Sequence, residues 1–317
     1  MKILIDIGHP AHVHYFKNLI RIMSDSYNFK FIITARDKEM THYLLDHYKI
    51  KYYNRGKGSN NIIGKFLYLI IANIKLLGIS LKHKPDIFLS FGSPYAAQVS
   101  YVMGKYSITL DDTENAKLGH LLYRYFTNKI LSPKSFSKNF GQKHLKFNGY
   151  MELSYLHPNY FKPNEDVLSL LKLGLNDRFI FIRFVKWKAN HDLGHNGMSI
   201  ENKFLAVKEF EKYGKVFISS EELLPSKFDK YLIKIPKHLI HSVLFYASLV
   251  YGESATMASE SAVLGTPSIY IDNDGRGYTD EQDKKYGLVY NFSESEKDQI
   301  NSIKKGVVIL KEKKLKS

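Results

Sequence analysis

The sequence predicts an α/β fold with two Rossmann-like, parallel-sheet domains that face a central cleft. Short apolar segments alternate with longer segments of helical spacing, which is the pattern of right-handed βαβ units. This alternation runs twice, and residues 152–164, with two prolines, interrupt it once. The 317 residues are 44% hydrophobic, enough for two cores. We therefore expect an N-terminal domain at residues 1–158 and a C-terminal domain at residues 159–317.

The N-terminal domain is expected to begin with an apolar core strand, which is not a secretory signal. The helical segments place apolar residues three and four positions apart. A polar, glycine-containing stretch at 55–61 predicts a flexible loop. In chain order the expected strands are 2–7, 29–34, 51–53, 86–90, 107–110 and 129–131, and the expected helices are 13–24, 38–48, 62–82, 96–103 and 115–127.

The C-terminal domain is expected to repeat the pattern. Its predicted strands are 179–183, 215–219, 249–251 and 268–271, and its predicted helices are 200–212, 238–247, 256–264 and a basic last helix at 293–316. One option for the last helix is to pack back on the N-terminal domain. Because ligands of open parallel sheets bind at the carboxyl ends of the strands, the turns that follow the strands are the candidate site.

The composition excludes several classes of function. The net charge of +15 attracts polyanions, including nucleic acid, anionic lipid and phosphorylated substrates. No helix-turn-helix, zinc-finger or RNP signature is present, so no nucleic-acid partner is expected. The chain has no cysteine, which excludes disulfides and thiolate metal sites and fits a cytoplasmic location.

The apolar segment 62–81 leaves two interpretations open. Asn73, Lys75 and Gly78 interrupt it, so it is too short and too broken to predict a transmembrane span. It is either a buried or half-buried helix of the first domain, or a helix that lies on a membrane surface with its lysines at the headgroups. The second interpretation would put the protein at the inner face of the membrane as a peripheral contact.

The segment 249–267 is the most informative one, because it predicts a strand, a small-residue turn and a short helix. The turn lets backbone N–H groups approach an anion, and the helix dipole points at the same place. Glu260 lies one turn beyond Thr256 on the same helix face, where a carboxylate can bind a ribose. The alternative is an ordinary strand–turn–helix unit whose Glu complements the helix dipole. The candidate substrate-binding residues here are Gly252, Ser254, Ala255, Thr256 and Glu260.

Polar residues also follow three strands of the first domain. His9 and His14 are candidate bases or substrate-binding groups after the first strand, and their alternative is a helix-capping or surface role. Asp112 and Glu114 lie in an acidic turn that offers a general base or an ion site, or else ordinary helix caps. Glycine and serine turns here are candidate backbone contacts to substrate: Gly8, Gly92 and Ser93.

A long polar segment, 183–197, follows the first strand of the second domain. Arg183 and Lys186 are candidates to bind a diphosphate. His191 is a candidate acid or base with Asp192 beside it. A plain surface loop is the alternative for each of them.

Six motifs in order carry a resemblance to a known family over nearly the full length. They are DIGHPAHVHYFKN (6–18), FGSPYAA (91–97), DDTENA (111–116), NGYMELSYLHP (148–158), RFVKWKANHDLGHNG (183–197) and GESATMASESAVLGTP (252–267). The chain resembles a family of GT-B-like proteins known as a domain of unknown function, often encoded beside surface-polysaccharide genes. The wider relatives of this fold are UDP-sugar glycosyltransferases and non-hydrolysing UDP-N-acetylglucosamine 2-epimerases.

The resemblance implies that the second domain holds the nucleotide, with Ser254, Ala255 and Thr256 at the diphosphate and Glu260 at the ribose. It places His191 where the epimerases carry a catalytic His, and Asp112 and Glu114 near their acidic residues. The chain departs from the epimerases around the acidic turn. It also has His9-Pro10 where the peptidoglycan N-acetylglucosaminyltransferase has a glycine-rich loop.

The leading hypothesis is a glycosyltransferase that uses a nucleoside diphosphate sugar, with UDP as the expected nucleotide, in surface polysaccharide or glycolipid synthesis. Arg183 and Lys186 would stabilise charge on the departing diphosphate. His14, His9 or Asp112 would deprotonate a glycan or lipid-linked acceptor. No metal and no cofactor are expected. The alternatives are a UDP-sugar 2-epimerase-like enzyme and a non-catalytic nucleotide-sugar-binding protein.

Overall fold

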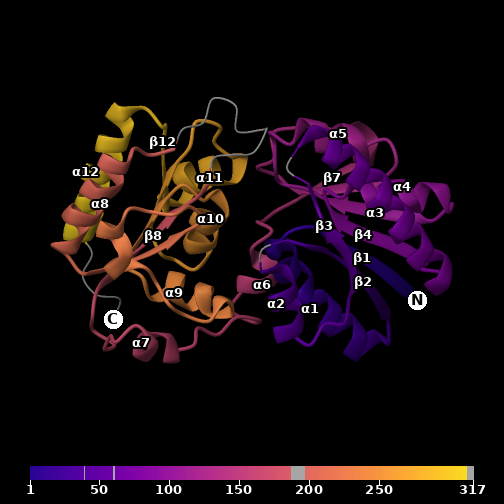
Figure 1. Cartoon of the computed structure of the whole chain (residues 1–317), viewed down its shortest axis with the longest axis horizontal. Coiled ribbons are helices and arrows are strands. Elements are labelled where there is room, and N and C mark those ends of the chain that lie inside the picture. Colours follow the sequence, from indigo (N-terminus) through magenta and orange to yellow (C-terminus); the bar gives the residue numbers. More distant parts are fainter. Residues whose placement is uncertain (39, 60, 187–196, 313–317) are drawn as a thin grey trace. The chain divides into compact units, whose positions relative to one another are not determined.

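A computed structural model describes residues 1–38, 40–59, 61–186 and 197–312. The chain divides into two compact units, Met1–Tyr160 and Phe161–Ser317, each described here by itself (Figure 1). The boundary predicted between residues 158 and 159 lies two residues before this division. Each unit contains one sheet whose strand pairs are parallel, so the prediction of an α/β fold with two parallel sheets is confirmed.

The N-terminal unit has a seven-stranded sheet in the order β3-β2-β1-β4-β5-β6-β7. Its strands are β1 Lys2–Ile7, β2 Lys30–Asp37, β3 Tyr53–Lys57, β4 Ile87–Phe91, β5 Tyr106–Leu110, β6 Lys129–Pro133 and β7 His144–Phe147. Its helices are α1 Pro10–Tyr27, α2 Thr41–His47, α3 Ile62–His83, α4 Pro94–Val102, α5 Lys117–Tyr123 and α6 Leu153–Leu156, with a 3₁₀ turn at Gly141–Lys143.

The strand order fixes which helices cover which face of this sheet. The chain runs from β1 outward to β3 and then returns to β4 on the other side of β1. Because parallel crossovers are right-handed, α1 and α2 lie on one face, and α3, α4 and α5 lie on the other. The helix contacts agree, since α1 touches α2 and α6, and α4 touches α3 and α5. β1 is buried from Ile3 to Ile7, as expected for a strand covered on both faces.

The prediction of a flexible loop at residues 55–61 is wrong for residues 55–57. Tyr53–Lys57 forms β3 and pairs in parallel with β2. Arg55 is fully buried there because an acidic partner, Asp6, compensates its charge. The strand β7 and the helix α6 were not predicted from the sequence. The helix α6 packs on α1, so part of the expected interdomain connection belongs to the N-terminal unit.

The C-terminal unit has a five-stranded sheet in the order β12-β11-β10-β8-β9. Its strands are β8 Phe179–Phe184, β9 Lys215–Ser220, β10 Leu249–Gly252, β11 Ser268–Ile271 and β12 Val289–Phe292. Its helices are α7 Asp166–Leu170, α8 Ile200–Glu211, α9 Ile240–Tyr246, α10 Ala255–Val263, α11 Gly277–Glu281 and α12 Glu296–Glu312. Two 3₁₀ turns, Ser226–Tyr231 and Lys237–Leu239, and a π turn, Gln282–Tyr286, complete the unit.

Apolar clusters cover both faces of this sheet. One cluster joins residues of β8, β9 and β10 to α8 and α12, with Phe210 and Ile303 at its centre. A second cluster joins β8 and β10 to α7 and α9 through Phe181 and Leu244. The last helix, α12, packs on α8 and on β10, β11 and β12. The sheet therefore lies between two apolar layers, with the turns that follow β8 and β10 at its carboxyl edge.

Candidate functional site

The turn between β1 and α1 holds the first candidate residues. His9 is the N-cap of α1, and its Nδ1 accepts a hydrogen bond from Ala11 N at 3.2 Å. His9 thus fills the capping role that the sequence left open. The Gly8 N–H donates to Nδ1 of His12 at 3.2 Å, and the His12 ring lies 4.9 Å from the Phe91 ring at the end of β4. His12 therefore links the turn after β1 to the end of β4 at the carboxyl edge of the sheet.

The acid–base state of His12 follows from its surroundings. Burial of the ring lowers the pKa of His12 well below its usual range, and the nearby charges of His9, Lys38 and Arg55 lower it further. This agrees with its Nδ1, which accepts a hydrogen bond as a neutral imidazole does. His12 is a neutral group at physiological pH.

His14 lies away from this turn, inside the packing of α1. It is 5% exposed, and its ring stacks on Tyr155 at 5.4 Å and meets the edge of Tyr48 at 5.9 Å. Nζ of Lys17 lies 3.5 Å from its Nδ1. These contacts favour a packing role for His14 between α1, α2 and α6.

The turn after β4 contains Gly92, with φ at +54°, and Ser93. Ser93 is the N-cap of α4, where its Oγ accepts from Ala96 N, and its hydroxyl donates to the carboxylate of Asp6. The hydroxyl of Thr34 donates to the other oxygen of Asp6 at 2.8 Å. The hydroxyl of Ser93 is therefore engaged in hydrogen bonds within the fold. The backbone of this turn remains the candidate for substrate contact.

A group of carboxylates follows β5. Asp112 is buried, and Oδ1 accepts a hydrogen bond from the Thr113 hydroxyl at 3.1 Å. Burial raises the pKa of Asp112 well above its usual range, and the charges of Glu152, Asp111 and Glu114 add to the rise. Asp112 is thus a stronger proton acceptor than an ordinary Asp, and it is set up to hold or exchange a proton.

The helix-capping alternative for this acidic turn is wrong. The N-cap position of α5 is Ala116, which caps with no side chain. Asp111 instead accepts from Thr113 N at 2.9 Å and from the Tyr123 hydroxyl, and His120 Nε2 lies 3.1 Å from its Oδ2. Asp111 is therefore held by its own turn and by two partners on α5.

The turn after β10 is the first candidate of the C-terminal unit. Gly252 has φ at +143°, and a Cβ there would come within 2.0 Å of the carbonyl oxygen of Arg183 on β8. The two strands approach this closely because the position is glycine. Ser254 then caps α10 by accepting from Met257 N at 3.4 Å. Ser254, Ala255 and Thr256 are half-buried, so the start of α10 reaches the surface of its unit.

Glu260 lies deeper along α10 than Thr256. It is 4% exposed, and its Oε1 is 2.9 Å from Nε2 of His241 on α9. The pair joins two adjacent helices behind the start of α10. His241 was not identified from the sequence, since nothing in its local pattern marks it.

Arg183 and Lys186 differ in their surroundings, because the Arg183 side chain has protein partners and the Lys186 side chain is exposed. The Arg183 guanidinium donates to the Ser219 hydroxyl at 2.7 Å and forms an ion pair with Glu221. The Lys186 side chain is exposed, and its backbone N–H donates to Glu221 at 3.4 Å. Lys186 therefore offers a solvent-facing ammonium near the end of β8. His191 and Asp192 lie outside the residues that the structure describes.

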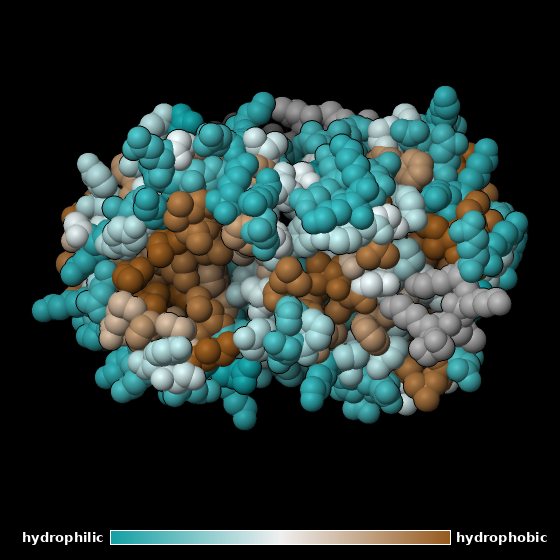
Figure 2. Space-filling model, turned by 180° about the vertical axis from the view of Figure 1, so that it is seen from behind, coloured by the Kyte–Doolittle hydropathy of each residue, from teal (hydrophilic) through white to brown (hydrophobic). Residues whose placement is uncertain are grey.

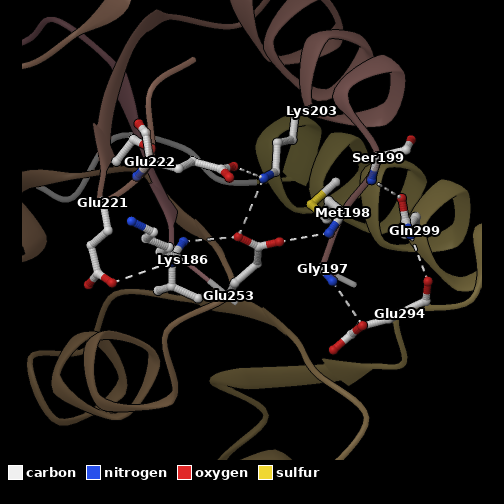
Figure 3. Close-up of polar contacts among 12 residues, drawn as sticks. Lys186, Gly197, Met198, Ser199, Lys203, Glu221, Glu222, Glu253, Glu294 and Gln299 are labelled. Atoms are coloured by element: carbon white, nitrogen blue, oxygen red, sulfur yellow. Dashed lines mark hydrogen bonds and ion pairs between the residues drawn. The ribbon is translucent and has the colours of Figure 1, made fainter. Parts of the chain in front are cut away.

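Glu253 organises this edge, as Figure 3 shows. Its Oε2 accepts from Val185 N at 3.0 Å, and its Oε1 accepts from Met198 N at 2.7 Å. Nζ of Lys203, a buried residue of α8, lies 3.8 Å from Oε2. The Glu253 side chain is fully buried, so it brings two distant backbone positions together at the end of β10.

A second set of contacts supports the same segment. Glu294 accepts from Gly197 N at 2.9 Å, and Gln299 accepts from Ser199 N at 3.1 Å (Figure 3). Gln299 also donates to the carbonyl of Glu294 at 2.6 Å. The backbone from Gly197 to Ser199 is therefore held by three acidic or amide side chains from separate elements.

Neither Glu253 nor Glu152 was predicted as a site residue from the sequence, although both lie inside the six motifs. The usable signal for Glu253 was its position directly after β10, at the carboxyl edge of the sheet. Within the described residues, no cluster of three or more His, Asp or Glu side chains is placed to hold a metal ion.

The chain matches other proteins at low identity over most of its length. An uncharacterised protein of Methanocaldococcus jannaschii, MJ0665, is 22% identical over 285 residues, which cover 85% of this chain and 81% of that protein. The UDP-GlcNAc 2-epimerase of Neisseria meningitidis, solved with UDP-GlcNAc bound, superposes with a TM-score of 0.74 at 16% identity, covering 96% of this chain and 91% of the epimerase.

The spinosyn rhamnosyltransferase SpnG, solved with spinosyn aglycone, superposes with a TM-score of 0.58 at 11% identity and covers 99% of this chain and 92% of that structure. At such identities the likeness establishes the fold, which is GT-B-like, as the sequence motifs predicted. The family described as "Protein of unknown function (DUF354)" matches residues 1–315, and the chain therefore belongs to that family.

Proposed function

We propose that this protein is a GT-B enzyme that acts on a nucleoside diphosphate sugar, with a UDP-sugar as donor. The start of α10 carries the proposal. A glycine that allows close strand approach, three small half-buried residues and a helix N-terminus come together there, with Glu260 one turn deeper. Backbone N–H groups and the helix dipole suit a diphosphate, and a carboxylate behind them suits the hydroxyls of a ribose.

The basic groups near this turn would have distinct roles. Lys186, whose side chain is exposed, would meet the diphosphate directly and stabilise the charge that develops as it departs. Arg183 would act through Glu221 and Ser219, holding the end of β9 beside the turn. His241 would orient the carboxylate of Glu260 toward the ribose.

The reaction that we propose is transfer of the sugar to a hydroxyl of a glycan or lipid-linked acceptor. The bond between the sugar C1 and the diphosphate oxygen breaks, a bond from C1 to the acceptor oxygen forms, and the acceptor proton passes to a base. We propose Asp112 as that base, because it is buried beside other carboxylates and a raised pKa makes its carboxylate a stronger base. His14 is less suited, since its ring is packed against Tyr155.

A second candidate is epimerisation of the sugar nucleotide without any acceptor. The grouping of Asp112 with Glu152 and Asp111 favours it, because inverting a sugar carbon requires removing and returning a proton. The epimerase of N. meningitidis shares the fold, and its structure binds UDP-GlcNAc. The third candidate is a non-catalytic protein that binds the nucleotide sugar and leaves it unchanged.

One experiment separates these candidates. Purified protein is incubated with a panel of UDP-sugars and no acceptor, and the products are followed by NMR. A transferase releases UDP and free sugar slowly, an epimerase converts one UDP-sugar into another, and a binding protein leaves the bound nucleotide unchanged. Absence of binding to every nucleotide sugar would reject all three.

A variant tests the ribose contact. Glu260→Gln should weaken UDP-sugar binding by roughly 1–3 kcal/mol, because a charged acceptor of two hydroxyl hydrogen bonds is lost. Glu209→Gln, on the exposed side of α8, is the matched control and should leave affinity unchanged. Unchanged affinity in a folded Glu260 variant would remove this residue from the site.

A further inference from the structure

The N-terminal unit carries an apolar face on the outer side of α3. Exposed apolar residues recur at three- and four-residue spacing along this helix, with Ile63 at 77%, Phe66 at 63% and Ile74 at 65% exposure. The opposite side of the helix is buried at every fourth residue: Tyr68, Ala72, Leu76 and Ser80. Both sides of α3 are therefore apolar, but only one of them packs on the sheet.

The apolar face continues onto the neighbouring helices. α4 ends with exposed Tyr101 and Val102, and α5 exposes Leu118 and Leu121. These helices lie next to one another on the same side of the sheet, since α4 contacts both α3 and α5. Figure 2 shows hydrophobic residues gathered in a broad patch on the N-terminal unit, at the left of the view. Patches of this breadth on a protein surface mark interaction sites.

The charged side chains within the three helices of this face have one sign. No Asp or Glu occurs in residues 62–85, 94–106 or 115–129, which include α3, α4 and α5. Exposed lysines lie within and beside the same helices: Lys65, Lys75, Lys82, Lys84, Lys105 and Lys117. An apolar centre with basic flanks complements the surface of an anionic lipid bilayer, where negatively charged headgroups overlie an apolar interior.

The topology excludes a membrane crossing by α3, although residues 63–83 are long and apolar enough by composition alone. α3 connects β3 to β4, and both strands belong to the same hydrogen-bonded sheet. A spanning α3 would put these strands on opposite sides of a bilayer and break the order β3-β2-β1-β4. Leu76 also packs in the core with Leu4 and Phe88. The exposed face can therefore lie on a bilayer but not pass through it.

We propose that the outer face of α3, with the ends of α4 and α5, docks on an anionic phospholipid membrane. Apolar side chains such as Phe66 and Ile74 enter the interface, and the lysines meet the headgroups. A second copy of the chain fits less well, because a two-fold interface would set this basic face against itself with no carboxylate to neutralise it. The proposal does not depend on the proposed function, since it invokes no nucleotide sugar.

Vesicle flotation tests the proposal with the full chain. The protein should bind vesicles that contain phosphatidylglycerol at 0.15 M salt and bind phosphatidylcholine vesicles much more weakly. Ile70→Glu with Ile74→Glu should reduce binding at least about tenfold, since it places two carboxylates in the apolar face. Leu175→Glu with Leu223→Glu, two exposed leucines of the C-terminal unit, is the matched control and should bind as the wild type does.

A spectroscopic measurement locates the contact. The chain has no cysteine, so Ile74→Cys provides one attachment point for an environment-sensitive fluorophore. Its emission should shift to the blue and increase on addition of anionic vesicles. The same label at Leu223→Cys should not respond. Each variant is compared with the wild type by circular dichroism and thermal melting, so that loss of binding is separated from loss of fold.

Three results would overturn the proposal. One is the absence of binding to anionic vesicles by folded wild-type protein. Another is equal loss of binding in the α3 variant and in the control. The third is a wild-type dimer that the α3 variant converts to a monomer while neither binds vesicles, which would make this face an interface between copies.

Discussion

Nε of Arg55 lies 3.0 Å from Oδ1 of Asp6, and both side chains are almost completely buried in the N-terminal unit. The guanidinium also lies over the ring of Tyr95, 4.1 Å from its centre, and donates to the Tyr68 hydroxyl at 3.2 Å. Asp6 is the penultimate residue of β1, shortly before the turn that contains His9. The ion pair therefore joins β3, at one margin of the sheet, to the strand that leads into the candidate turn.

Arg55→Met should destabilise the protein by about 3–5 kcal/mol, because it leaves Asp6 buried without its charged partner. The unfolding free energy from denaturant titration measures the effect. Adding Asp6→Asn to this variant should recover part of the loss, since the uncompensated charge is removed. A cost below about 1 kcal/mol for Arg55→Met would mean that the pair is open to water in solution.

Gly252→Ala should be strongly destabilising, because a Cβ would collide with the backbone oxygen of Arg183 and the φ of +143° is strained for any other residue. Backbone strain of this kind costs about 1–3 kcal/mol before the collision is added. Gly265→Ala is the matched control, with φ at +77° and no atom within 4 Å of the added Cβ. The melting temperature of Gly252→Ala should be clearly lower than that of Gly265→Ala. Equal melting temperatures would contradict the close approach of Gly252 to the carbonyl oxygen of Arg183.

Asp112→Asn should change how stability depends on pH. The pKa of Asp112 is raised in the folded protein, so the folded state holds this proton more tightly than the unfolded state does. The resulting stabilisation is present at low pH and is lost as pH rises through the raised pKa. The variant stays neutral, so its melting temperature should rise relative to that of the wild type as the pH increases above about 4, the ordinary pKa of Asp. A constant difference across that range would show that the carboxyl group is not perturbed.

The same substitution should lower turnover on a UDP-sugar by roughly 10²–10⁴-fold if Asp112 transfers a proton. Glu209→Gln on α8, the control already used for Glu260, provides the comparison in both assays.

Glu253→Gln should loosen the backbone at both Val185 and Met198. An amide side chain has one acceptor oxygen instead of two, so the N–H groups of Val185 and Met198 compete for it and both contacts weaken, at a cost of about 1–3 kcal/mol. Hydrogen exchange at these two amides should become faster than in the wild type. Glu221→Gln, which removes a weaker contact to Lys186 N at 3.4 Å, should leave both amides protected.

Local patterns were sufficient to predict most of the fold. The apolar runs of β1 and β8 and the helical spacing of α1 and α8 lie where the sequence placed them. β12 was missed, since Val289–Phe292 is four residues long with a polar Asn and becomes a strand by pairing with β11. β3 was placed too early, because the burial of Arg55 depends on Asp6, 49 positions away, and no local pattern contains that information.

The candidate site was predictable where one segment contains it and not where distant segments meet. The turn from Gly252 to Thr256 lies as the sequence placed it, directly after β10. His241 was missed because only the packing of α9 on α10 brings it to Glu260. The alternatives for segment 62–81 also needed the fold, since helical spacing cannot tell which of two apolar sides meets the sheet.

The place of β1 in its sheet has a consequence for synthesis of the chain. Asp86 accepts a hydrogen bond from the backbone of Lys2, 84 positions earlier, at the start of the pairing between β1 and β4. On the ribosome, one edge of the first strand stays unpaired until α3 and β4 have emerged. Pairing between residues so far apart in the chain is slow. Until β4 pairs with β1, the nascent N-terminal unit therefore exposes one unpaired edge of its first strand, which can associate with other chains.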